Sequence, residues 1–224
     1  MEASSIIVFI IAFLEILLGF YVLSRNKKDP INISFFIVVM GVVIWICSNA
    51  IISFLSNENT IELIYRLTYI AGAIIAGGFL YFSWVFPYKM SFIRWSKWLL
   101  LLIPTIFLII FTFTTDFIVS GVVKYPLSYD TTSGSGYGLY VLIFVAFFLW
   151  AFYELFRKLR RSDGIHHWQL KFVLISVLIP FVVSLVTDII LPWTGYDRGM
   201  LMMFAGSMSS AVWLGLNGYI LFKK

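Results

Sequence analysis

The stretch ISFFIVVMGVVIWICSNAIISFL, residues 33–55, runs for 23 residues without a charged side chain. A helix needs about 20 consecutive apolar residues to cross a bilayer, so this stretch predicts a transmembrane helix. Six further apolar stretches lie at residues 4–24, 62–86, 97–115, 138–156, 169–190 and 200–222. Each exceeds the roughly 9–11 residues of a membrane β-strand and lacks its alternation. The sequence therefore predicts an all-α integral membrane protein, one bundle of seven transmembrane helices over residues 1–224.

The composition of the whole chain favours the same class. Hydrophobic residues make up 61% of the 224 residues and charged residues only 12%, whereas a soluble domain carries about 25% charged residues. Cys47 is the single cysteine, which excludes an intrachain disulfide and a cysteine-based metal cluster. In so apolar a chain the net charge of +5 indicates topology signals and contact with anionic lipid, and we expect no nucleic-acid partner.

The distribution of basic residues predicts the orientation of the bundle. Of the 16 Lys and Arg residues, only Arg66, Lys124 and Arg198 fall on one side, and the remaining 13 fall on the other. The positive-inside rule then places the N-terminus outside and the C-terminus in the cytoplasm. We expect the basic cytoplasmic loop RKLRR, residues 157–161, to contact anionic headgroups.

The connection between the fourth and fifth predicted helices is long and lies on the outer side. FIVSGVV, residues 117–123, and KYPLSY, residues 124–129, are two short β-prone stretches. A turn rich in Gly and Ser, TTSGSGYG at residues 131–138, follows them. This pattern predicts a small β-hairpin over the outer mouth of the bundle.

Polar residues inside the apolar stretches are candidates for function, because burying them in lipid is costly. Glu15 lies near the middle of the first stretch, where it either senses protons, binds a polar group of a ligand, or stays protonated and hydrogen-bonded to Asn217 or a serine. Asn49 and Asn217 lie in the second and seventh stretches. Interhelical hydrogen bonds are their ordinary role, and ligand binding by Asn49 is the alternative.

Arg66 and Asp188 lie at matching depth, each about one turn from the outer end of its stretch. As a pair facing an outer cavity they would recognise a polar ligand. The alternatives are a structural ion pair or an arginine whose guanidinium reaches the headgroups.

Features of enzymes are missing from the sequence. His166 and His167 are adjacent, so on a helix they point about 100° apart and are poorly placed to chelate one metal ion. The chain has no phosphate-binding Walker loop and no lysine in the centre of the seventh stretch for a retinal Schiff base. We expect no catalytic residues, no cofactor and no metal.

Five segments together suggest a family. They are YVLSRNKKDPINISFFIVVMGVVIW (residues 21–45), YRLTYIAG (65–72), FLYFSWVFP (79–87), GSGYGLYVLIFVAFF (134–148) and HHWQLKFVLISVLIPFVVSLVTDIILP (166–192). In this order the chain resembles the seven-transmembrane N-terminal sensor region of bacterial and archaeal histidine kinases. The resemblance extends over essentially the whole chain.

The resemblance implies a multi-pass sensor in the plasma membrane of a prokaryote that passes a ligand or membrane signal to a cytoplasmic histidine-kinase module. No kinase sequence follows Lys224, so the expected output lies on another chain, or the chain acts alone. The resemblance leaves a homodimer open. The alternative interpretation is a small transporter or channel subunit with a polar path near Glu15, Asn49 and Asn217.

Overall fold

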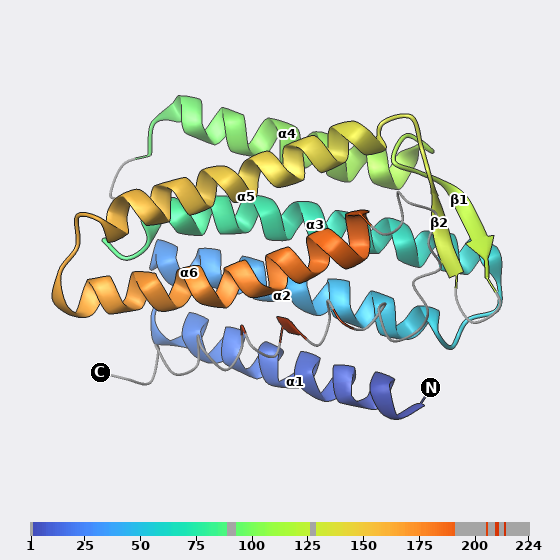
Figure 1. Cartoon of the computed structure of the whole chain (residues 1–224), viewed down its shortest axis with the longest axis horizontal. Helices are drawn as coiled ribbons and strands as arrows, with labels where there is room; N and C mark the ends of the chain where they lie inside the picture. Colours follow the sequence, from blue (N-terminus) through green and yellow to red (C-terminus); the bar gives the residue numbers. More distant parts are fainter. Residues whose placement is uncertain are drawn as a thin grey trace.

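A computed structural model describes residues 2–88, 93–125 and 129–190, together with Ala205, Ser209, Ser210 and Trp213. Within these residues, six helices are long and apolar enough to cross a membrane (Figure 1). The helices are α1 (Glu2–Arg25), α2 (Pro30–Ile52), α3 (Glu58–Val85), α4 (Trp95–Thr114), α5 (Tyr137–Leu159) and α6 (Gly164–Ser184), followed by the π-helix η1 (Leu185–Ile190).

The first six predicted stretches each coincide with one of these helices, and the seventh, residues 200–222, lies outside the described residues. The predicted bounds are wrong by several residues where polar caps extend a helix. α2 begins at Pro30 because Asp29 accepts a hydrogen bond from the backbone N–H of Ile31 at 3.0 Å. α3 begins at Glu58 because Asn57 accepts one from the N–H of Thr60 at 3.1 Å.

The hairpin between α4 and α5 is present, but its second strand was placed too early. β1 (Val119–Lys124) pairs antiparallel with β2 (Tyr129–Ser133), with Lys124 opposite Tyr129. Residues 131–133 were interpreted as part of the turn, yet they belong to β2. The β-branched Thr131 and Thr132 suit a strand, and their opposite positions on β1 are Val122 and Gly121.

The connections between helices gather at two ends of the bundle. The hairpin end holds β1, β2 and the α2–α3 connection, whereas the basic end holds the α1–α2, α3–α4 and α5–α6 connections (Figure 1). Arg25, Lys28, Arg94 and Arg161 all lie at the basic end.

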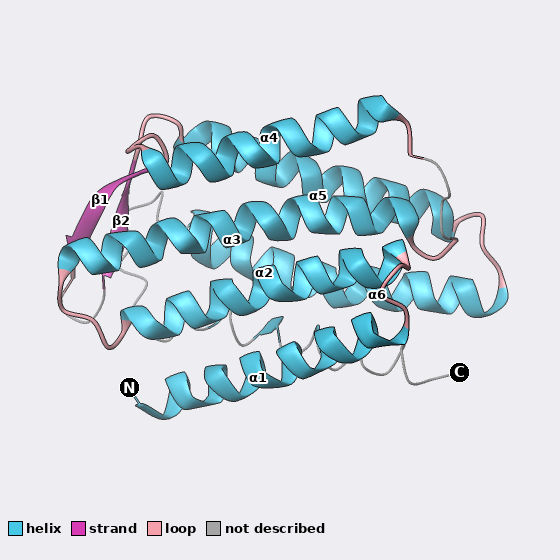
Figure 2. Cartoon of the chain, turned by 180° about the vertical axis from the view of Figure 1, so that it is seen from behind, coloured by secondary structure: helices cyan, strands magenta, loops and turns pink. Residues whose placement is uncertain are grey.

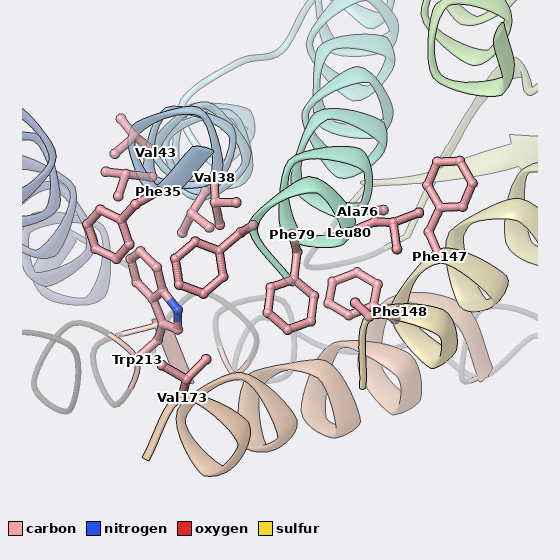
Figure 3. Close-up of a cluster of buried hydrophobic side chains, with 14 of the residues drawn as sticks. Phe35, Val38, Val43, Ala76, Phe79, Leu80, Phe147, Phe148, Val173 and Trp213 are labelled. Carbon is pink, nitrogen blue, oxygen red and sulfur yellow. The ribbon is translucent and has the colours of Figure 1, made fainter. Parts of the chain in front are cut away.

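α2 and α3 occupy the middle of the bundle, and α1 and α4 form its opposite edges (Figure 2). The core contains an aromatic cluster that includes Phe35, Phe79, Phe148 and Trp213 (Figure 3). The two edge helices instead expose large apolar side chains, among them Ile10, Phe13, Leu17 and Phe20 on α1 and Leu100, Ile103, Ile106 and Phe113 on α4. Apolar surfaces of this extent suit contact with lipid rather than with water.

Candidate functional site

A cavity of about 140 Å³ lies inside the bundle, between α2, α3, α5 and α6. Its described walls also include Ser210 and Trp213. Nine of the 19 described lining residues are aromatic, namely Trp45, Tyr65, Tyr69, Phe79, Tyr140, Phe144, Phe148, Phe181 and Trp213. Concave, apolar cavities with few polar groups are the usual form of small-molecule sites. We refer to this space as the central cavity.

The central cavity extends from the hairpin end towards the middle of the bundle. Its lining on α3 runs from Tyr65 to Phe79, a distance of about 21 Å at 1.5 Å per residue. On α2 the lining runs from Val38 to Asn49. The space is therefore elongated along the helices.

Three tyrosines fix the wall of the central cavity near the hairpin. Tyr65 donates a hydrogen bond to the carbonyl of Tyr129 in β2 at 2.5 Å, and the Tyr69 hydroxyl lies 3.2 Å from Oγ1 of Thr131. Tyr140 on α5 donates to the carbonyl of Tyr69 at 3.0 Å. These bonds tie α3 to both α5 and β2, so the hairpin is part of the site's frame.

Gly72 permits the close approach of α5 to α3 at this point. A Cβ at position 72 would lie 2.3 Å from the Tyr140 hydroxyl oxygen. Any side chain there would displace Tyr140 and break its bond to α3. Small residues such as this glycine are what lets helix backbones approach closely in membrane proteins.

Asn49, one of the predicted site residues, lies in the wall of the central cavity. Its residue exposure is 9%, and its carboxamide makes no hydrogen bond within the described part of the chain. An amide carries two donor hydrogens and an accepting oxygen, so a group inside the cavity can bind it.

Glu15, also a predicted site residue, lies behind this wall rather than in it. Its exposure is 0%, and Ser210, a residue of the cavity wall, is beside its carboxyl group. However, neither carboxyl oxygen makes a hydrogen bond of ordinary geometry to a described residue. The contact with Ser210 is therefore weak. Asn217, the other partner considered for Glu15, lies outside the described residues.

Replacing Glu15 by leucine is expected to raise the free energy of unfolding in detergent by about 1–3 kcal/mol, since it removes a buried carboxyl group that makes no hydrogen bond of ordinary geometry to a described residue. Thermal melting followed by circular dichroism measures the change. The matched control is Glu154→Leu, which removes a buried carboxylate that Arg157 contacts at 2.8 Å, and this variant should be less stable. A destabilised Glu15→Leu variant would show instead that the Glu15 carboxyl makes a favourable interaction.

Arg66 is buried at the hairpin end and joins three elements. Its Nη2 lies 2.7 Å from Glu62 and 2.6 Å from Asp116. Its remaining bonds go to the backbone carbonyls of Thr112, Thr115 and Val119, at 3.1, 2.5 and 3.3 Å. The first two carbonyls end α4, where the helix leaves acceptors unpaired and the dipole is negative. Arg66 thus joins α3 to the end of α4 and the start of β1.

The structure leaves the predicted pairing of Arg66 with Asp188 untested, because the Asp188 side chain lies outside the described residues. The partners that it does show include Asp116, which the sequence reasoning missed. Asp116 follows the fourth stretch directly, so its place at the start of the connection to the fifth stretch was the available signal.

A second buried cation closes the basic end. Lys158 on α5 donates from Nζ to the carbonyls of Ser83, Trp84 and Phe86 at 2.8, 2.8 and 2.6 Å. These carbonyls end α3, so the ammonium sits at the negative end of that helix. We predicted that Lys158 contacts lipid headgroups. Instead, its three donors are used inside the protein.

The bundle of long apolar helices, with an aromatic-lined cavity between them, defines a polytopic helical membrane protein. The chain matches, over residues 7–223, the family described as the N-terminal 7TM region of histidine kinase. The match covers nearly all of the chain, which belongs to this family and is a membrane sensory domain of the histidine-kinase type. No match was found among curated proteins.

Proposed function

We propose that the chain senses a small molecule in the central cavity and passes the signal to a cytoplasmic kinase module. The hairpin end faces the outside and the basic end faces the cytoplasm. The observation that carries the proposal is the cavity itself, because its walls come from helices that continue to the basic end. A ligand there contacts the same helices that meet the output module.

The route from the cavity to the basic end runs through the α5–α6 pair. Phe148 on α5 and Phe181 on α6 both line the cavity, and their rings stack at 4.6 Å between centroids. Lys158 holds α5 to α3. The position of α6 determines where Phe181 lies in the wall of the cavity. A ligand that binds one arrangement of α6 better than another shifts the population towards it.

Orientation is tested by labelling with a membrane-impermeant maleimide, starting from a Cys47→Ala chain, which has no other cysteine. Lys124 in β1 and Arg161 after α5 are both exposed. We expect Lys124→Cys to be labelled in intact cells and Arg161→Cys only after permeabilisation. The reverse pattern would invert the proposed direction of signalling.

Signalling is tested by joining the chain to the kinase module of a characterised sensor kinase and measuring autophosphorylation in nanodiscs. Val42→Phe adds a ring inside the cavity, so we expect it to change basal autophosphorylation by about threefold or more. The matched control is Val182→Phe, at an exposed position of α6 outside the cavity lining. Equal activities for Val42→Phe, Val182→Phe and the parent would contradict the proposal.

A further inference from the structure

We infer that the central cavity takes an uncharged, elongated and largely aromatic or aliphatic molecule with one neutral hydrogen-bonding group, which Asn49 binds. The inference rests on the proposed function only in taking the cavity as the ligand site. It adds the chemical class of the ligand and the residue that recognises its polar group.

The charges near the cavity disfavour an anion. The described lining includes no charged side chain. Arg66 is next to the lining residue Tyr65, but a guanidinium has five N–H donors, and all of its nitrogens already bond to Glu62, Asp116 and backbone carbonyls. Lys158 has likewise bonded its three donors to carbonyls. An anion in the cavity would therefore be desolvated without a described partner.

A cation is disfavoured for a similar reason. Aromatic rings attract cations, and Trp45 and Trp213 are both in the wall. No described carboxylate lines the cavity, however, since Glu15 is behind the wall. A cation would lose its hydration in an apolar span without a counter-ion. Neutral molecules are free of this penalty.

The polar part of the ligand is indicated by Asn49. Its carboxamide is nine-tenths buried and without a described partner, at a position where the neighbouring wall is apolar. Leaving a buried amide unpaired is costly. The hydroxyls of Tyr65 and Tyr140 are already bonded to backbone carbonyls. Asn49 and Ser184 are described lining residues with both donor and acceptor capacity left. Asn49 is the more buried of the two, so its amide is the group that a hydroxyl or carbonyl of the ligand would satisfy.

The apolar part of the ligand is indicated by the shape of the walls. Phe144 and Phe148 on α5 face Phe181 on α6, at 6.4 and 4.6 Å between centroids. Phe79 and Trp213 belong to the same aromatic cluster further along (Figure 3). Flat rings stacked beside an elongated space favour a planar or extended molecule over a compact polar one.

The test compares four probes of one shape with the chain in nanodiscs: biphenyl, 4-phenylphenol, biphenyl-4-carboxylate and 4-phenylbenzylammonium. Binding is followed by equilibrium titration and by the shift in Tm. We expect saturable binding of 4-phenylphenol and weaker binding of biphenyl. Binding of either charged probe should be at least tenfold weaker than that of 4-phenylphenol.

Variants assign the polar contact. Asn49→Leu should weaken the binding of 4-phenylphenol by about tenfold, which corresponds to the loss of one hydrogen bond of about 1.4 kcal/mol. The affinity for biphenyl should change by less than about twofold. Asn49→Ala should do the same if Asn49→Leu misfolds. The control Ser48→Ala changes the preceding residue on α2, which does not line the cavity. This variant should bind both probes with the affinity of the parent. Val42→Phe should abolish the saturable binding of both probes. This loss distinguishes binding in the cavity from partition of the probes into lipid.

Three results would overturn the inference. They are an absence of saturable binding, a charged probe that binds as tightly as 4-phenylphenol, and an Asn49→Leu effect of equal size on biphenyl and 4-phenylphenol. A different result would reject the proposed function without rejecting the ligand class. Asn49-dependent binding without any response of the kinase fusion to Val42→Phe would reject sensing and leave the ligand class standing.

Discussion

The chain in which alanine replaces Arg66 is expected to lose about 3–5 kcal/mol of its free energy of unfolding in detergent, the usual cost of removing one partner from a buried ionic network. Arg66 is 8% exposed and holds the end of α4 and the start of β1 to α3. Its removal leaves buried carbonyls without donors and frees the carboxylate of Glu62. Thermal and chemical unfolding in a mild detergent measure the loss.

The two acidic partners of Arg66 should contribute unequally. The side chain of Asp116 is 78% exposed, whereas that of Glu62 is 29% exposed. Exposed ion pairs are worth about 0–1 kcal/mol, so Asp116→Asn should be nearly neutral and Glu62→Gln should cost more. Arg66→Lys should be intermediate between the parent and Arg66→Ala, because an ammonium has three donors and no planar fork.

Double-mutant cycles separate these partners from the one predicted from the sequence. The cycle of Arg66→Ala with Glu62→Gln should show coupling, because the two side chains are in contact. A cycle of Arg66→Ala with Asp188→Ala tests the predicted pair directly. An Arg66→Ala variant as stable as the parent would mean that the carbonyls at the end of α4 find other donors, and Arg66 would then have no structural role.

The sequence was sufficient for the six described helices and for the presence of a hairpin between α4 and α5, because both follow from local patterns. Long uncharged stretches have few alternatives in a bilayer, and two neighbouring β-prone stretches favour a hairpin. The predicted position of the second strand was wrong, since it depends on which hydroxyls and carbonyls of β2 meet Tyr65 and Tyr69 on α3.

The site could be predicted only in part. Asn49 was chosen because an amide is unusual in an apolar helix, and it does line the central cavity. The aromatic residues that line the cavity could not be predicted, since nothing in the sequence distinguishes Phe144 and Phe148 from the other members of a set of 23 phenylalanines. The role of Lys158 was missed because a lysine near a basic loop has the same sequence pattern whether it faces lipid or caps a helix that lies far away in the chain.

The Lys158→Met variant is expected to lose about 2–4 kcal/mol of unfolding free energy, because a hydrogen bond to a charged group contributes about 1.5–3 kcal/mol net and the three bonds of one ammonium are not additive. Met preserves the length and apolar stem of the side chain, so packing is retained while the carbonyls of Ser83, Trp84 and Phe86 lose their donor. The matched control is Lys171→Met, at an exposed position whose one described contact is with the Trp168 ring. The free energy of unfolding of this control should stay within about 0.5 kcal/mol of that of the parent.

The same change tests whether the basic end depends on the state of the central cavity. Lys158 fixes the end of α5 to the end of α3, so a ring placed in the cavity by Val42→Phe displaces α6 against a held α5. Without that bond α5 can follow α6, and the relative movement at the basic end becomes smaller. In the kinase fusion, the effect of Val42→Phe on autophosphorylation should therefore shrink when Lys158→Met is also present. If the two changes act additively, Lys158 stabilises the bundle without contributing to transmission, and the relative movement of α5 and α6 is not the signal.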